Sequence, residues 1–222
     1  MDETAAPADP YAGLLTELRG PVASIQSYVR TLIARDADLS APARATIHQG
    51  ILQQSRRLDG FVDDIVLYVR LLAGGMSTES EPVLLAGVLE ELRQDLGEPD
   101  RVVVDGVDAV VHTDRAALVA ALRRLLRNAL VYGPRTGTVA VRVSVDGGWT
   151  EIAVSDTGVG IPEERQQAAL EPFGRAVHPQ ERRKDGVGLG LSVARELVKL
   201  LDGEVVLRDN DPGLTVLVRL PR

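Results

Sequence analysis

Two apolar stripes with heptad spacing dominate the first third of the chain and restrict what it can fold into. The first consists of Tyr11, Leu15, Leu18, Val22, Ile25, Val29 and Leu32, and the second of Ile47, Ile51, Gln54, Leu58, Phe61, Ile65, Tyr68 and Leu72. Alternating steps of four and three residues place such positions along one side of a long helix. Ser40, as an N-cap, and Pro42, in the first turn, mark the start of the second helix. Residues 11–75 are therefore predicted to form an antiparallel helical hairpin.

A single hairpin has little against which to bury these stripes. Pairing two copies of residues 11–75 would close a four-helix bundle, so we expect a homodimer. The alternative is that the stripes pack on the rest of the same chain. Residues 1–10, which are acidic and rich in Ala and Pro, are expected to be a disordered lead, and residues 76–81 a linker.

After the linker, the pattern changes to short β-branched runs that alternate with helical stretches, over residues 82–222. Strands are predicted at 102–104, 109–111, 139–145, 151–155, 204–208 and 214–220, and helices at 83–96 and 113–131. These elements predict an α/β sandwich, in which helices cover one face of a mixed sheet. The chain as a whole is thus expected to be an α+β protein that begins with a helical bundle.

The composition narrows the classes of function. The 222 residues carry a net charge of −7, and binding to nucleic acid needs a basic surface, so nucleic acid is not expected as a partner. The absence of cysteine excludes disulfides and thiolate metal sites. No apolar run approaches the roughly 20 residues that a membrane-spanning helix needs, and no secretory signal opens the chain. We expect a cytoplasmic protein without a membrane segment, although the cytoplasmic part of a larger receptor would have the same composition.

A glycine motif near residue 190 is typical of a phosphate-binding loop. Gly186, Gly188 and Gly190 alternate with Val187 and Leu189 and lead into a helical pattern. A helix N-terminus offers unpaired backbone N–H groups and the positive end of the helix dipole, and glycines let the backbone approach a phosphate closely. The same pattern also occurs in ordinary loops, so it needs support from elsewhere in the chain.

Two further motifs suit a bound nucleotide. Asn128, near the end of the helix predicted at 113–131, offers an amide oxygen that could bind Mg²⁺ together with waters and phosphates. Asp156 follows a predicted strand and opens the run Asp-Thr-Gly-Val-Gly, and its carboxylate could accept a hydrogen bond from the amino group of a base. Alternatively, Asn128 is a polar residue on an exposed helix face and Asp156 caps a turn.

Between these motifs lies a polar segment, residues 173–185. Five of its side chains are basic or histidine, namely Arg175, His178, Arg182, Arg183 and Lys184. The segment is too polar for a core and long enough to form a mobile lid over a site. The alternative is a solvated loop.

The order of these four elements, namely Asn in a helix, Asp-x-Gly-x-Gly, a lid and Gly-x-Gly-x-Gly, resembles the ATP-binding domain of sensor histidine kinases. That domain belongs to a wider group of ATPases that includes gyrase, Hsp90 and MutL. The resemblance covers about residues 80–220, and the preceding hairpin resembles the dimerisation and phosphotransfer domain of the same kinases. It implies that ATP and Mg²⁺ are the ligands and that a response regulator is a partner.

The resemblance also implies roles for individual residues. Asn128 would hold Mg²⁺ on the ATP phosphates, and Asp156 would accept from the adenine amino group. Tyr132 would lie against the base, and Phe173 would anchor the start of the lid. The remaining residues would be Gly158 and Gly160 in the base pocket, Gly186, Gly188, Leu189 and Gly190 around the phosphates, and Arg175 or Lys184 at the γ-phosphate.

The chain departs from the family at the phosphorylated histidine, where the family motif is roughly His-Glu-Leu-Arg-x-Pro. Here the stretch begins with Thr16 at the acceptor position, while Glu17, the neighbour that assists proton removal, is kept. A hydroxyl needs a strong base to become a nucleophile, so autophosphorylation by the usual route is not expected. Arg124 also stands, one turn before Asn128, where the family usually has another Asn.

Three hypotheses about function remain open. In the first, the chain is a histidine kinase-like signalling protein that binds Mg-ATP, lacks its own acceptor, and acts by conformation or on a partner. In the second, it is an active kinase core in which Thr16 replaces a histidine by engineering. In the third, it is a phosphotransfer or adaptor scaffold with a decayed ATP site, although such relatives usually lose the glycine motifs that persist here.

Overall fold

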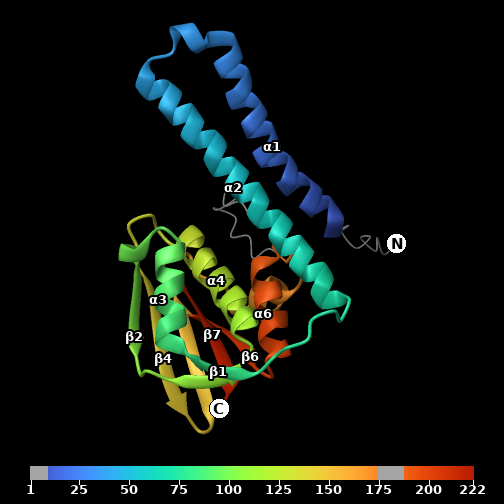
Figure 1. Ribbon diagram of the computed structural model, residues 1–222, viewed down its shortest axis with the longest axis vertical. Coiled ribbons are helices and arrows are strands. Elements are labelled where there is room, and N and C mark those ends of the chain that lie inside the picture. The colour runs from blue at the N-terminus through green and yellow to red at the C-terminus, as the bar shows by residue number, and fades with distance from the viewer. Residues whose placement is uncertain (1–9, 175–187) are drawn as a thin grey trace, which may run out of the picture. The chain divides into compact units, whose positions relative to one another are not determined.

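The computed structural model describes residues 10–174 and 188–222, which are drawn as ribbons in Figure 1. They divide into two compact units, one that ends at Leu67 and one that begins at Tyr68. The expected disordered lead at residues 1–10 lies almost entirely outside this range. Within it, no helix is both long enough and apolar enough to cross a membrane.

The first unit consists of one long helix and most of a second, which form the predicted helical hairpin. Helix α1 spans Pro10–Arg35, the 3₁₀ turn η1 spans Asp36–Asp38, and helix α2 spans Ala41–Leu72 (Figure 1). The Ser40 hydroxyl accepts a hydrogen bond from the Ala43 N–H at 3.4 Å, as expected for an N-cap. The two helices approach closely at Gly50, where an added Cβ would lie 2.8 Å from the Tyr28 ring.

The apolar stripe of α1 divides between half-buried and exposed positions. The half-buried ones are Leu18, Ile25 and Leu32, and the exposed ones are Leu15, Val22 and Val29. Each set repeats every seven residues, so each forms its own line along the helix. The hairpin therefore leaves a line of apolar side chains at its surface.

The second unit is built on a five-stranded sheet. Its strands are β2 (Val102–Gly106), β4 (Val139–Asp146), β5 (Trp149–Ser155), β6 (Glu204–Asp209) and β7 (Leu214–Pro221), in the order β2-β4-β5-β7-β6. Strand β2 pairs with β4 in parallel, whereas the other neighbours are antiparallel. The predicted mixed sheet is thus confirmed.

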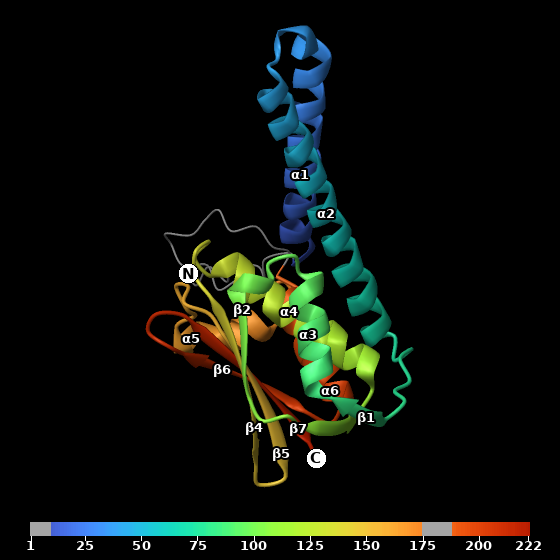
Figure 2. The same ribbon diagram turned by 60° about the vertical axis from the view of Figure 1, so that its left-hand side comes forward.

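Helices cover one face of this sheet, as predicted. Helices α3 (Leu85–Asp95), α4 (Arg115–Tyr132) and α6 (Gly190–Leu200) lie on the same side of the strands in Figure 2. Alternation along β4 reflects this arrangement, because Val139, Val141 and Val143 are buried while Ala140, Arg142 and Ser144 are exposed. The core lies between the helices and this face of the sheet.

The structure corrects the bounds of two predicted helices and adds a third helix. The helix predicted at 83–96 begins at Leu85, two residues later than predicted, because Glu81–Leu84 forms strand β1. Strand β1 pairs with β3 (Val110–Thr113) in a separate two-stranded sheet. The helix predicted at 113–131 begins at Arg115, after the Asp114 carboxylate accepts a hydrogen bond from the Ala117 N–H at 2.8 Å. Helix α5 (Glu163–Leu170) was not predicted, although acidic residues after a proline are typical of a helix start.

Candidate functional site

The C-terminal half of helix α4 carries the predicted Asn128 next to the glycine motif. Asn128 is half-buried, and a Cβ added at Gly190 would lie 3.0 Å from both Nδ2 and Oδ1 of its amide. Gly190 is the first residue of α6, and Leu189 before it is 1% exposed and makes no capping hydrogen bond through its side chain. The Asn128 amide therefore lies at a helix N-terminus, where backbone N–H groups are available to an anion.

Asp156 follows strand β5 and points into the helix-covered side of the sheet. It shares its side of the strand with Ile152 and Val154, both buried, and is itself 8% exposed. Its N–H donates to the Leu214 carbonyl at 2.9 Å, and its Oδ1 accepts from the Gly158 N–H at 2.7 Å. Backbone contacts on both sides thus fix the orientation of this buried carboxylate.

The Asp156 segment packs against the end of helix α4. A Cβ added at Gly158 would lie 2.6 Å from the Tyr132 carbonyl oxygen, and one added at Gly133 would lie 3.7 Å from the Asp156 Cβ. Asn128 and Tyr132 are four residues apart, a rise of about 6 Å along a helix. The Asn128 and Asp156 motifs therefore adjoin the same turn of α4, on the same side of the sheet.

Gly160 extends this region to the turn between β6 and β7. Its φ of +68° favours glycine, and an added Cβ would lie 2.8 Å from both the Asp209 Oδ1 and the Gly213 carbonyl oxygen. The loop after Asp156 is therefore held between the end of α4 and this turn.

The start of the lid predicted at residues 173–185 lies beside Gly188, three residues after the predicted end of the lid. Phe173 has a φ of 61°, and Gly188 has a φ of +71° with an added Cβ 2.7 Å from the Gly174 carbonyl oxygen. The predicted contacts Arg175, Lys184 and Gly186, and most of the lid, lie outside the described residues.

The predicted acceptor residues belong to the first unit. Thr16 and Glu17 lie in helix α1, and their side chains are outside what the structure describes. Arg124 lies in α4, and its Nη1 donates to the Ala120 carbonyl at 2.9 Å. The guanidinium of Arg124 is thus directed toward the N-terminus of the helix, away from Asn128.

A cation at this site would depend on ligands from outside the chain. Among the described residues, no group of three or more His, Asp or Glu side chains could hold a metal ion. Asn128 offers one neutral oxygen, whereas Mg²⁺ prefers about six oxygen ligands. Phosphates and waters would therefore have to supply most of them.

Sequence reasoning missed one residue beside the site, Arg101. Its guanidinium donates hydrogen bonds to three backbone carbonyls that lie 29 to 36 residues later in the chain, in the last turn of α4 and in the turn after it. No local pattern marks such a residue, because an arginine in a short polar segment is ordinary. Only the folded arrangement reveals its contacts.

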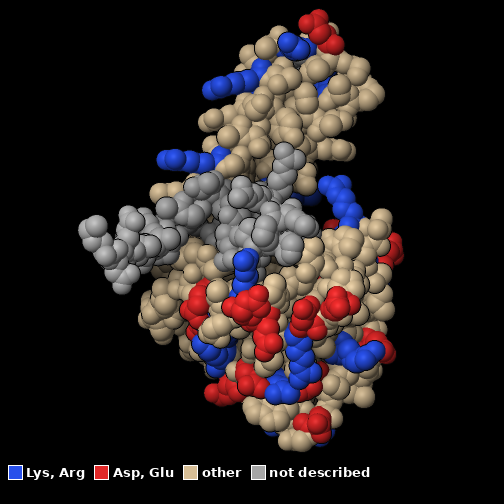
Figure 3. All heavy atoms as spheres, turned by 180° about the vertical axis from the view of Figure 1, so that it is seen from behind, with Lys and Arg blue, Asp and Glu red and all other residues tan. Residues whose placement is uncertain are grey.

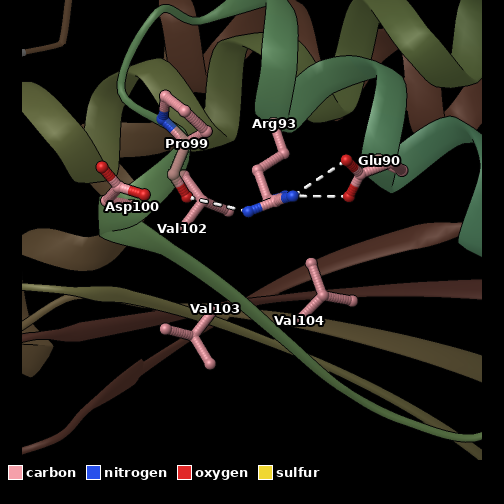
Figure 4. Close-up of a pocket in the computed structure, with 7 residues that line it drawn as sticks. All are labelled: Glu90, Arg93, Pro99, Asp100, Val102, Val103 and Val104. Carbon is pink, nitrogen blue, oxygen red and sulfur yellow. Dashed lines mark hydrogen bonds and ion pairs between the residues drawn. The ribbon is translucent and has the colours of Figure 1, made fainter.

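Two surface cavities lie away from the predicted site residues. One, of about 450 Å³, is bounded by α3 and β2, where the Arg93 guanidinium binds the Glu90 carboxylate and the Pro99 carbonyl (Figure 4). The Glu90 carboxylate also accepts a hydrogen bond from the Gln94 side chain. The bond from Arg93 and, second, the bond from Gln94 lower the pKa of Glu90 to about 2. The other cavity, of about 430 Å³, lies on the open face of the sheet around Ala140 and Ser155.

Charged side chains of both signs are interspersed over the second unit. Figure 3 shows acidic and basic side chains next to one another, without a large patch of a single sign on the visible face. Arg219, for example, bonds to Glu151 at 2.6 Å and to Glu204 at 2.9 Å, and these contacts raise its pKa.

Comparison with known proteins relates most of the second unit to a family of ATPases. Residues 113–222 match the profile of a family described as histidine kinase-, DNA gyrase B- and HSP90-like ATPase. Among curated proteins, the sensor histidine kinase AtsR of Burkholderia thailandensis is 32% identical over 235 residues, covering 99% of this chain and 38% of its own length. The chain thus spans about two fifths of the length of the curated relatives it matches.

Solved structures share the fold across both units. The histidine kinase AdeS of Acinetobacter baumannii gives a TM-score of 0.70 at 19% identity, covering 92% of this chain and 96% of that one. The histidine kinase ThkA, solved in complex with response regulator protein TrrA, gives 0.68 at 18% identity, covering 95% and 60%.

Proposed function

We propose that this chain, a homologue of sensor histidine kinases, binds Mg-ATP in two-component signalling. The match of residues 113–222 to the histidine kinase-, DNA gyrase B- and HSP90-like ATPase family supports this proposal. The proposed site lies around the last turn of α4, between the start of α6 and the Asp156 segment. We further propose that the chain does not phosphorylate itself at Thr16.

One observation carries the ATP proposal. A single turn of α4 has the Asn128 amide against Gly190 at one end and the Tyr132 carbonyl against Gly158 at the other. The glycines let both segments pack closely on α4, because a Cβ would come within 3.0 Å of Asn128 at Gly190, beside a helix N-terminus, and within 2.6 Å of the Tyr132 carbonyl at Gly158, beside a buried carboxylate. This arrangement suits a triphosphate at one end and a base at the other.

The groups of the chain then have distinct tasks. The Asp156 carboxylate, held by the Gly158 N–H, accepts a hydrogen bond from the adenine amino group, and Tyr132 lies against the base. The first N–H groups of α6 bind phosphate oxygens, together with Gly188 and Leu189. The Asn128 amide oxygen would hold Mg²⁺ together with the phosphates and waters, and the ion would supply positive charge against the phosphates.

The threonine at position 16 sets the limit of the proposed chemistry. Glu17 beside it can accept a proton, but a threonine hydroxyl is a much weaker nucleophile than imidazole without a strong base. We expect no acid-labile phosphate when the protein is incubated with labelled ATP. If Thr16→His then incorporates acid-labile label, the rest of the chain is a competent kinase, which favours the hypothesis of an engineered threonine. If it does not, a natural degenerate kinase is favoured.

We also propose that residues 11–75 pair two copies of the chain and that a response regulator docks on the bundle. The exposed line of Leu15, Val22 and Val29 on α1 is what a second hairpin would cover. The homology to sensor histidine kinases supports both parts of this proposal, and the ThkA–TrrA complex supports the second part.

Calorimetry tests the ATP proposal. A non-hydrolysable ATP analogue is titrated into the protein with and without Mg²⁺, and we expect saturable binding of one nucleotide per chain that is tighter with Mg²⁺. Absence of binding with the protein at high micromolar concentration would reject the proposal and favour the scaffold with a decayed site.

A further inference from the structure

Arg101, in the short helix η2 (Pro99–Arg101), lies beside the candidate site but belongs to none of its motifs. Its guanidinium donates to the carbonyls of Pro134 at 2.8 Å and Gly137 at 3.0 Å, and more weakly to that of Leu130 at 3.4 Å. Its Nη1 also binds the Glu98 carboxylate, and the side chain is only 19% exposed. One side chain thus joins the end of α4 to the turn that follows.

The chemistry of this contact is specific to arginine. The last carbonyls of a helix lack partners within the helix and favour a nearby positive charge. Helix α4 has no basic residue in its own last turn, so η2 supplies the charge from another segment. A planar guanidinium with five donors can bind several carbonyls at fixed angles, whereas a lysine ammonium acts as a point charge.

The segment that Arg101 holds, residues 132–137, packs directly against the Asp156 segment. A Cβ added at Gly137 would lie 3.0 Å from the Thr157 hydroxyl oxygen, and the Tyr132 carbonyl lies against Gly158. The turn itself is closed by a hydrogen bond from the Gly137 N–H to the Pro134 carbonyl at 2.9 Å. Any displacement of residues 132–137 would therefore also displace residues 156–158, which form the base side of the proposed site.

We propose that Arg101 is a positioning residue that fixes the base side of the site by clamping residues 132–137 against residues 156–158. The proposal rests on the proposed ATP site and adds a residue from outside its motifs. Because Asn128, against which Gly190 of α6 packs, lies one turn before Tyr132 on α4, the phosphate side should not depend on this clamp. Loss of Arg101 should therefore weaken recognition of the base and leave recognition of the phosphates intact.

Calorimetry with two ligands separates these effects. ATP and tripolyphosphate, which has no base, are titrated with Mg²⁺ into the wild type, Arg101→Ala, Arg101→Lys and the control Arg123→Ala. Arg123 lies on α4, the helix whose end Arg101 binds, but it pairs with Asp95 at 2.9 Å on an exposed surface. We expect Arg101→Ala to weaken ATP binding by about tenfold or more, as for the loss of charge-assisted hydrogen bonds, with tripolyphosphate binding unchanged. Arg101→Lys should be weakened less than the alanine variant, and Arg123→Ala should match the wild type.

Amide hydrogen exchange without ligand gives a second test that does not depend on ATP. Residues 132–137 and 156–158 should exchange faster in Arg101→Ala and Arg101→Lys than in the wild type or Arg123→Ala. If Arg101→Ala does not fold, Arg101→Lys carries both tests.

The proposal is overturned if exchange in these two segments is unchanged. It is also overturned if ATP binds the variants as it binds the wild type, or if ATP and tripolyphosphate lose affinity equally. A wild type that binds no ATP would instead contradict the proposed function, while the exchange result still decides the role of Arg101.

Discussion

Asp156 is the residue on which proposed base recognition depends most. Replacing it with Asn keeps the shape and the acceptor for the Gly158 N–H, but presents an amide donor where the adenine amino group would donate. We predict that Asp156→Asn weakens ATP binding by about 10- to 100-fold, the range for a hydrogen bond to a charged group of about 1.5–3 kcal/mol. Calorimetry with ATP measures this change.

The matched control for Asp156→Asn is Asp105→Asn, whose carboxylate is 75% exposed at the sheet edge. It should bind ATP as the wild type does. Equal affinities of Asp156→Asn and the wild type would contradict the role of Asp156.

The Glu90–Arg93 pair provides a residue-scale test of electrostatics. Because the bonds from Arg93 and Gln94 hold the pKa of Glu90 near 2, below its ordinary 4.5, the carboxylate stabilises the folded state above pH 4.5. That contribution is lost as the pH falls from 4.5 toward 2. We predict that Arg93→Ala raises the pKa of Glu90 toward 4.5, as measured by carbon-detected NMR titration.

Arg115→Ala is the control for this titration, because Arg115 pairs with the neighbouring Glu91. It should leave the pKa of Glu90 near 2. A Glu90 pKa that stays near 2 in Arg93→Ala would show that Arg93 is not its main cause.

Single residues differed in how far the sequence could reveal them. Asp156 and Gly190 stand in short motifs whose residue types suit their surroundings, so their proximity to α4 could be anticipated through family resemblance. Arg101 could not be found, because its partners lie 29 to 36 residues away. Asp114 carries the ordinary signal of an N-cap, yet the strong apolar pattern after it obscured the helix start.

At the scale of elements, the β6–β7 turn supports the end of β5. Gly213 has a φ of +111°, and an added Cβ would overlap the Asp156 carbonyl oxygen. Gly147, in the β4–β5 turn, has a φ of +55° and open space around it. We predict that Gly213→Ala costs more than about 3 kcal/mol of unfolding free energy, because strain and overlap add, whereas Gly147→Ala costs about 1–2 kcal/mol.

Urea unfolding followed by fluorescence of Trp149, the single tryptophan, measures both variants, because Trp149 lies in β5 of the same sheet. Equal losses of stability in the two variants would show that the β6–β7 turn does not press on Asp156.

Elements with strong periodicity could be predicted, and those decided by distant partners could not. Helix α4 and strands β4 and β7 were predicted to within a few residues, since each has a long, regular apolar pattern. Strand β1 was read as the start of a helix because four residues carry little periodicity. What makes it a strand is its pairing with β3, about 30 residues later.

For the whole molecule, the account predicts a dimer held by the exposed line on α1. Val29→Glu places a charge in that line and should weaken self-association at least about 100-fold, since an unpaired buried charge costs several kcal/mol. Ser27→Glu, an exposed position on the opposite side of α1, should leave it intact. Sedimentation velocity at a series of concentrations measures both.

A Val29→Glu protein that dimerises as the wild type does would contradict pairing through this line. The sequence could predict that the hairpin needs a covering surface, because its stripes are too apolar to stay exposed. It could not show which positions remain exposed in one copy, since this depends on how α1 and α2 pack.

The central claim is that one pocket, around the last turn of α4, binds Mg-ATP, and NMR mapping tests it most directly. Titration with a non-hydrolysable ATP analogue and Mg²⁺ should shift the amide signals of Gly133, of residues 156–160 and of residues 188–190. Residues 102–104, beside the α3–β2 cavity, should not shift. Shifts confined to that cavity, or none in the three predicted segments, would contradict the claim.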